Sequence, residues 1–369
     1  MNERYDIAIV GAGMAGASLA AELAGHASVL LLEGEAQPGY HSTGRSAAFW
    51  EESYGGPQVY PLTAASEAFL RDGGFLSPRG ALNIGREADR AKLEAFVARF
   101  QAAGVRIELL DRAGIAAKVP GLRDDWTGGA WEPACADIDV AGVHAHYLAA
   151  ARRGGTRIEC NARLERAERE GDSWRLVTAR GTGFRAGVLV NAAGAWADGV
   201  AQVAGLAPLG IAPLRRTVAQ LRTDPAPRRD LPLVLDINER FYFKPDGARV
   251  WLSPHDEVPS DPCDAAPEEL AVAEAIDRFG RVVDWRIDAV ERRWAGLRSF
   301  APDRLPVYGF DPAQPAFFWF AGQGGFGIQT APAAARLGAQ LLLGLPADAV
   351  TARIDPALYS PARFHAHLP

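Results

Sequence analysis

Cysteine is scarce in this chain. Cys135, Cys160 and Cys263 are the three cysteines in 369 residues, and they lie far apart in the sequence. An odd number of widely spaced cysteines provides no disulfide framework and none of the paired spacings of a zinc site. We therefore expect a reducing, cytoplasmic location.

Histidine is also rare, with seven residues in the chain. Four of them form the pairs His144/His146 and His365/His367, whose members are two positions apart. On a helix this spacing directs the two side chains to different faces, away from a common metal ion. We expect no metal site.

Long apolar runs are missing as well. The sequence has no stretch of about 18 apolar residues, so we expect no integral membrane span. Glu3, Arg4 and Asp6 interrupt the first residues, which is unlike a signal peptide.

The formal charge is −6 and the basic residues do not cluster. We therefore expect no nucleic-acid partner.

The first 33 residues carry the pattern of a strand, a glycine turn, a helix and a second strand. Residues 5–10 are rich in Ile and Val, residues 17–23 are small or apolar, and residues 28–32 are again apolar. This order predicts the start of a doubly wound parallel sheet, and hence an α/β protein.

Later segments alternate between helical and β patterns. Helices are predicted over residues 61–71, 86–103, 140–153, 267–279 and 329–342. Strands are predicted within residues 157–190, 211–255 and 316–321. Nucleotide-binding signals occur at both ends of the chain and near its middle, which predicts two lobes built from interleaved segments.

A complete dinucleotide fingerprint follows the first strand. Gly11 permits the tight turn, Gly13 lets a pyrophosphate approach the backbone, and Gly16 lets the helix pack closely on the strand. The helix N-terminus supplies free N–H groups and positive dipole for the phosphates. Glu33 stands where it can accept hydrogen bonds from the ribose hydroxyls, and its charge disfavours NADP.

Two further segments favour FAD over NAD. Residues 188–196 form an apolar strand that ends in small residues, among them Ala193 and Gly194. Residues 322–327, which include Gly324 and Gly327, precede a helix whose N-terminus suits the electron-rich edge of a flavin. Taken alone, either segment is explained equally well by a turn that serves only packing. With the fingerprint, the two predict bound FAD.

Four longer motifs carry a family resemblance: residues 39–48 (GYHSTGRSAA), 136–139 (ADID), 294–300 (WAGLRSF) and 323–330 (QGGFGIQT). On these the chain resembles the D-amino acid oxidase superfamily of FAD enzymes, and within it the bacterial FAD-dependent D-arginine dehydrogenases. The resemblance implies a doubly wound Rossmann-like FAD lobe and a substrate lobe on a mainly antiparallel sheet. We expect residues 1–50, 136–212 and 294–369 in the FAD lobe, and residues 51–135 and 213–293 in the substrate lobe.

The resemblance also assigns roles to single residues. Arg216, Arg298, Tyr54 and Tyr242 match the side chains that hold the substrate carboxylate, and guanidinium groups suit that anion. Gly325 matches the glycine whose carbonyl accepts from the substrate amine. Positions beside the flavin are matched by Arg45, Ser46 and Ala47. Because no residue for covalent attachment is found, we expect non-covalent FAD.

Departures from the pattern concern the substrate side chain. An acidic residue that binds a guanidinium group is replaced by Ala81, and a pocket histidine is replaced by Phe49. We therefore expect a neutral or apolar side chain, although Glu51 is near enough in sequence to reach a cation. Strand alternation allows only one of Arg215 and Arg216 to face inward.

The resemblance implies an enzyme that oxidises a D-amino acid to an imino acid, which water converts to a 2-oxo acid and ammonia. The substrate partner is thus a small amine that bears a carboxylate. Alternatives are the oxidation of an N-methyl or cyclic amino acid, a flavin dehydrogenase of 2-hydroxy acids, and a catalytically silent flavin-binding subunit. Either dioxygen or a quinone would serve as electron acceptor.

Overall fold

A computed structural model describes residues 3–364 of the chain. His365 and His367 lie outside the described residues. The α-helices are α1 (Met14–Leu23), α2 (Tyr60–Asp72), α3 (Arg90–Ala102), α4 (Arg112–Lys118), α5 (Val140–Arg153), α6 (Ala197–Val203), α7 (Glu269–Gly280) and α8 (Ala331–Leu343).

The first large sheet has eight strands and is parallel at its centre. Its main path runs β10-β11-β12-β1-β2-β9, with β20 paired to β12 and β19 paired to β20. The pairs β1–β2, β1–β12, β2–β9 and β12–β20 are parallel. The strands are β1 (Arg4–Val10), β2 (Val29–Leu32), β9 (Arg157–Glu159), β10 (Leu164–Glu170), β11 (Ser173–Thr178), β12 (Gly183–Asn191), β19 (Val307–Asp311) and β20 (Gln314–Ala321).

Both faces of this sheet are buried. In β1, Ile7 and Ile9 face one apolar core, while Ala8 and Val10 face another. The first core is shared with α1, α5 and α8, and the second with α6 and the β10–β11 hairpin. Continuous apolar strands are expected where a parallel sheet is covered on both faces. The structure thus confirms the doubly wound fold class.

The second large sheet has ten strands and is mainly antiparallel, as expected. It runs β21-β18-β13-β16-β15-β14-β5-β7-β6, and β17 pairs with β13. Among its neighbours, β14 and β5 are parallel. The strands are β5 (Ala81–Gly85), β6 (Glu108–Asp111), β7 (Gly128–Glu132), β13 (Ala212–Asp224), β14 (Leu233–Asp236), β15 (Tyr242–Asp246), β16 (Arg249–Ser253), β17 (Val258–Pro259), β18 (Arg286–Phe300) and β21 (Gln323–Gly324).

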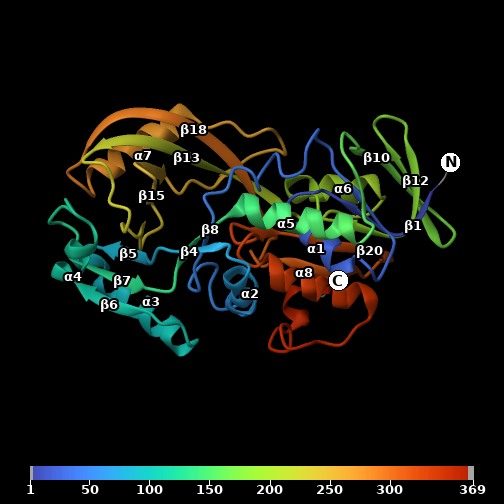
Figure 1. The fold of residues 1–369 in the computed structure, drawn as a ribbon, viewed down its shortest axis with the longest axis horizontal. Helices are drawn as coiled ribbons and strands as arrows, with labels where there is room; N and C mark the ends of the chain where they lie inside the picture. The colour runs from blue at the N-terminus through green and yellow to red at the C-terminus, as the bar shows by residue number, and fades with distance from the viewer. Residues whose placement is uncertain (1–2, 365–369) are drawn as a thin grey trace.

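Figure 1 shows the two sheets at opposite ends of the molecule. The strands β13 and β18 arch from the end that holds α4 and β6 toward the end that holds α1, α5 and α8. A small sheet of β3 (Phe49–Trp50), β8 (Ala136–Ile138) and β4 (Leu76–Pro78) lies between them. We propose that the lobes follow the boundaries given above, with β18 passing from one lobe into the other.

The 15-residue strand β18 is longer than any strand expected from the sequence. Its first eight residues are mostly charged and exposed, and its apolar alternation begins near Trp294. Pairing with β13 over almost its whole length supplies the backbone hydrogen bonds that local sequence preference does not predict.

Candidate active site

A cavity of about 440 Å³ lies where the two lobes meet. Most of its lining comes from segments within residues 10–15, 32–47, 162–164, 192–203, 296–299 and 323–328, and Arg216, Val218 and Tyr242 complete it. Val10 and Leu32 end parallel strands of the first sheet, and ligands of doubly wound folds bind at this edge. The volume lies within the range of small-molecule and cofactor sites.

The glycine turn after β1 is tightly packed at this edge. Gly11 has φ +100°, and a Cβ there would lie 2.5 Å from the carbonyl oxygen of Ala192. Gly13 lines the cavity at the start of α1. Gly16 does not line it; a Cβ at this position would collide with the carbonyl oxygen of Gly11. Gly16 therefore serves the packing of helix on strand.

Two side chains that the sequence reasoning missed support this turn. The Thr43 hydroxyl accepts a hydrogen bond from the Met14 N–H at 2.9 Å. The buried His144 donates from Nε2 to the carbonyl oxygen of Ala12 at 2.9 Å. Burial lowers the pKa of His144, so the ring stays neutral in this role. Thr43 belongs to the motif over residues 39–48, which is the signal that could have found it.

Glu33 lines the cavity at the end of β2. Its carboxylate accepts from the N–H groups of Ala12 at 3.0 Å and of Glu35 at 3.0 Å. These two bonds fix the carboxylate beside the glycine turn, where a ribose hydroxyl can reach it.

The other residues predicted to contact the cofactor also line the cavity: Arg45, Ser46, Ala47, Ala193, Gly194, Gly324 and Gly327. Arg45 has further partners. Its Nη1 donates to the carbonyl oxygen of Ala265 at 2.9 Å, and its guanidinium pairs with Asp264. Arg45 thus links the 39–48 segment to residues 264–265. Fewer of its N–H groups are left to donate to a ligand.

Arg216 extends from β13 into the cavity and is almost fully buried. Its Nε donates to the carbonyl oxygen of Asp256 at 2.7 Å, and its Nη2 bonds Glu257 at 3.2 Å. The buried Nη1 finds no hydrogen-bond partner among residues 3–364. Arg215 instead pairs with Glu268 at 2.6 Å and does not line the cavity.

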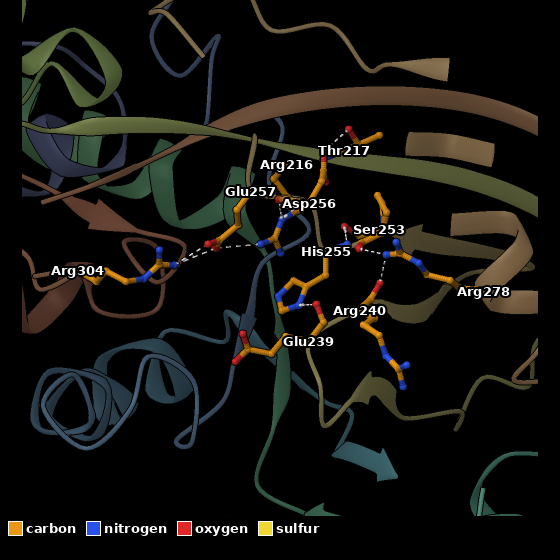
Figure 2. A network of polar contacts seen from close by, with 11 residues as sticks. Arg216, Thr217, Glu239, Arg240, Ser253, His255, Asp256, Glu257, Arg278 and Arg304 are labelled. Atoms are coloured by element: carbon orange, nitrogen blue, oxygen red, sulfur yellow. Dashed lines mark hydrogen bonds and ion pairs between the residues drawn. The ribbon is translucent and has the colours of Figure 1, made fainter. Parts of the chain in front are cut away.

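Figure 2 shows the loop that holds Arg216 in place. Glu257 lies between Arg216 and Arg304, and it bonds Arg304 at 2.8 Å. The Asp256 carboxylate accepts from the Thr217 N–H at 2.7 Å and from the Thr217 hydroxyl at 2.8 Å. The guanidinium is therefore fixed on one side and free on the other.

Arg298 and Gly325 line the cavity, and Tyr54 lies against both of them without lining it. A Cβ on Gly325 would collide with the Tyr54 hydroxyl and would lie 2.9 Å from Cζ of Arg298. Arg298 forms no ion pair within the described part of the chain. Burial and the charge of Arg298 lower the pKa of Arg216 to about 10, so the Arg216 guanidinium is charged at neutral pH. Burial raises the pKa of Tyr54, which keeps its hydroxyl protonated and able to donate.

An aromatic cluster lies at this end of the cavity; Tyr242 lines the cavity, whereas Phe49 and Tyr54 do not. The ring of Phe49 lies 5.6 Å from that of Tyr54 and 6.1 Å from that of Tyr242. The ring of His255 lies 5.8 Å from that of Tyr242. Burial and the charges of Arg216 and Arg298 lower the pKa of His255 to about 3, so this histidine is neutral. Its Nδ1 donates to the carbonyl oxygen of Glu239 at 2.8 Å (Figure 2).

Ala81 and Glu51 both lie outside the cavity lining. Ala81 is fully buried behind Phe49 and Tyr242. Glu51 is buried and accepts from the Ser53 hydroxyl at 3.3 Å, so the structure directs it away from a bound cation. Within residues 3–364, the acidic residues that line the cavity are Glu33 and Glu35, next to the glycine turn.

Among residues 3–364 there is no group of three or more His, Cys, Asp or Glu side chains that could hold a metal ion. The same residues include no helix long and apolar enough to cross a bilayer.

Comparison with known proteins places this cavity in context. A family model described as FAD dependent oxidoreductase matches residues 6–341. A D-amino acid dehydrogenase from Cereibacter sphaeroides is 29% identical over 267 residues, which cover 70% of this chain and 59% of that protein. A bifunctional ThiO/ThiG protein from Synechocystis is 27% identical over 267 residues, covering 69% of this chain and 37% of that protein. The chain thus spans between about a third and three fifths of these relatives.

Among solved structures, glycine oxidase from Geobacillus kaustophilus superposes with a TM-score of 0.85 at 23% identity. The match covers 100% of both chains. At this level of identity the likeness concerns the fold, and it extends over both lobes.

Proposed function

The chain belongs to the family of FAD-dependent oxidoreductases, and we propose that it oxidises the Cα–N bond of a D-amino acid whose side chain is neutral or apolar. One observation carries this proposal. Arg216 and Arg298 reach one end of the cavity with two positive charges, and the buried Nη1 of Arg216 has no partner among residues 3–364. A buried donor without a partner is costly, and a substrate carboxylate would satisfy it.

The cavity fits the cofactor of the family. Gly11, Gly13 and the start of α1 present backbone that a side chain would obstruct, and Glu33 faces the same space. Ser46, Ala47, Gly324 and Gly327 would lie beside the ring system. FAD, when bound, would accept the hydride that leaves the substrate Cα, and this hydride carries both electrons of the oxidation.

The side chains of this protein would then act by orientation. Arg216 and Arg298 would bind the carboxylate, and Tyr54 and Tyr242 would donate hydrogen bonds to it. The Gly325 carbonyl would accept from the substrate amine. With both ends of the Cα–N unit held, the Cα–H bond is aligned for transfer, and such positioning accounts for a large share of a rate increase. Water then hydrolyses the imino acid to a 2-oxo acid and ammonia.

Selectivity for a neutral side chain follows from where the acidic residues of the cavity lining lie. Glu33 and Glu35 are the acidic residues of the cavity lining in the described chain, and both belong to the cofactor end. A cationic substrate side chain near Phe49 would therefore lose its water without gaining an ionic partner. We expect weak oxidation of D-arginine and D-lysine.

A secondary amine is the second candidate. The rings of Phe49, Tyr54 and Tyr242 meet beside the clamp and would cover an N-methyl group or a pyrrolidine ring as readily as an alkyl side chain. The carboxylate clamp serves both substrates equally.

Anaerobic bleaching of the flavin tests the proposal. The purified yellow protein is mixed with neutral and basic D-amino acids, their L forms, sarcosine, D- and L-proline and 2-hydroxy acids. We expect bleaching and release of ammonia with neutral D-amino acids and little with D-arginine. Faster bleaching by sarcosine or proline would favour the secondary amine. If no compound bleaches the flavin, the substrate proposal is wrong and the cofactor assignment stands.

A further inference from the structure

The segment 51–54 is held by two buried side chains that come from distant parts of the chain. Glu132, at the end of β7, accepts from the Glu52 N–H at 2.7 Å and from the Ser53 N–H at 3.3 Å. Gln329, just before α8, accepts from the Glu51 N–H at 3.1 Å and donates to the carbonyl oxygen of Glu51 at 3.3 Å. Three successive backbone N–H groups thus end on two buried side chains.

This segment leads directly to Tyr54. The Tyr54 ring lies 5.9 Å from the guanidinium carbon of Arg298 and 6.0 Å from the ring of Phe326. Gly55 and Gly56 follow with φ +88° and +83°, a conformation that glycine adopts without strain. Residues 51–53 lead into Tyr54 from the N-terminal side, so the hydrogen bonds on their backbone help to place the Tyr54 hydroxyl.

We propose that Glu132 is a positioning residue, which anchors the 51–53 backbone and so holds Tyr54 against Arg298 and Gly325 for binding of the substrate carboxylate. This inference rests on the proposed function, because it assumes that a carboxylate binds at the clamp. Under the lobe boundaries proposed above, Glu132 belongs to the substrate lobe and Gln329 to the FAD lobe, so the two anchors of the segment come from different lobes.

A carboxylate suits the anchor better than an amide. One ionised Glu132 accepts both N–H groups, whereas a glutamine would turn its NH₂ group toward one of them. Hydrogen bonds to a charged acceptor are also about twice as strong as neutral ones. The anchor therefore depends on the charge of Glu132.

Glu51 is the neighbour that affects this charge. Burial and the proximity of Glu132 raise the pKa of Glu51 to about 8, and burial also raises the pKa of Glu132. Since the two N–H groups favour the ionised form of Glu132, Glu51 is the group that keeps its proton at neutral pH. Ionisation of Glu51 at alkaline pH would place a second negative charge near that of Glu132. The repulsion between the two carboxylates would displace residues 51–53 from the anchor.

Other titratable groups surround the pair. On the same segment and on α2 are Glu52, with a pKa raised by burial to about 7, and Glu67, Arg71 and Tyr60. From β8, β15 and the residue before β8 come Asp137, Lys244 and the buried Cys135. Glu51 shares Ser53 with the anchor, because the Ser53 hydroxyl donates to Glu51 at 3.3 Å and the Ser53 N–H donates to Glu132 at 3.3 Å. The variant Glu51→Gln therefore tests the contribution of this one carboxyl group.

The test uses the FAD-loaded protein and benzoate, a carboxylate without an oxidisable amine that stays ionised from pH 6 to 9. Binding is followed by the change in the flavin spectrum. At pH 7 we expect Glu132→Gln to raise the Kd of benzoate about tenfold, to raise KM similarly, and to change kcat much less. The matched variant Glu51→Gln keeps the anchor and should bind benzoate as the wild type does at pH 7.

The pH profile separates positioning from a general structural effect. In the wild type the Kd should rise above pH 8, and in Glu51→Gln this rise should vanish. An unchanged Kd for Glu132→Gln at pH 7, or the same alkaline rise in Glu51→Gln as in the wild type, would overturn the inference. If Glu132→Gln fails to fold, the Glu51→Gln profile alone decides. Failure of the wild type to bind benzoate at any pH would instead contradict the carboxylate clamp of the proposed function.

Discussion

At the scale of single residues, the charge at the clamp is the most informative feature. Glu257 and the carbonyl oxygen of Asp256 hold one edge of the Arg216 guanidinium, and the other edge faces the cavity. The site therefore requires a guanidinium group and not simply a positive charge, because the planar guanidinium binds a carboxylate through two parallel hydrogen bonds.

The change Arg216→Lys tests this requirement because it keeps the charge and removes the fork. We expect the KM of the best substrate to rise at least tenfold, which corresponds to about 1.4 kcal/mol. Arg215→Lys is the matched control, since Arg215 is its neighbour, pairs with Glu268 and does not line the cavity. Steady-state kinetics of both variants measure the effect. A similar KM in both would argue against the clamp.

At the scale of elements, the turn from β1 into α1 depends on contacts between backbones. Gly11 approaches the end of β12, and Gly16 approaches Gly11. Neither contact can be relieved by a rotamer change, since the atoms a Cβ would meet belong to the main chain. The element therefore tolerates side chains poorly even where they would not touch a cofactor.

Gly16→Ala should accordingly lose FAD and lower the stability of the protein. The new methyl group would collide with the carbonyl oxygen of Gly11, and overpacking of this kind typically costs about 1–3 kcal/mol. Gly280→Ala, at the end of α7, is the control because no atom lies within 4 Å of its added Cβ. Flavin absorbance per protein and thermal melting report both effects. Full flavin content in Gly16→Ala would show that the turn adapts.

At the scale of the whole molecule, the buried pair Glu51/Glu132 links stability to pH. In the unfolded chain Glu51 ionises near its ordinary pKa of 4.5, whereas in the folded protein it keeps its proton to about pH 8. Between these values the folded state binds more protons than the unfolded state, so stability falls as pH rises. The contribution is complete below pH 4.5 and is lost by about pH 8.

Glu51→Gln removes this dependence. We expect the variant to melt at nearly the wild-type temperature at pH 5, and at least about 2 °C higher than the wild type at pH 8.5. Melting curves of the FAD-loaded proteins at the two pH values measure the difference. An equal offset at both values would mean that Glu51 does not carry the raised pKa.

The sequence alone determined the first sheet, the cofactor and the family. The glycine fingerprint, the apolar strands and Glu33 are local patterns, because a turn, a buried strand and a helix N-terminus each depend on neighbours in the chain. The site residues other than Gly16 and Tyr54 line the cavity, although their roles stay predictions.

Tertiary structure decided what depends on distant partners. The long strand β18 exists through its pairing with β13, and the inward side of the Arg215/Arg216 pair depends on the position of β13 over the cavity. Glu132 and Gln329 converge on residues 51–53 from the end of β7 and from the turn before α8. In sequence, Glu132 is one glutamate at the end of a short strand. Its burial and its two hydrogen bonds depend on residues about 80 positions earlier in the chain, so no local pattern encodes them.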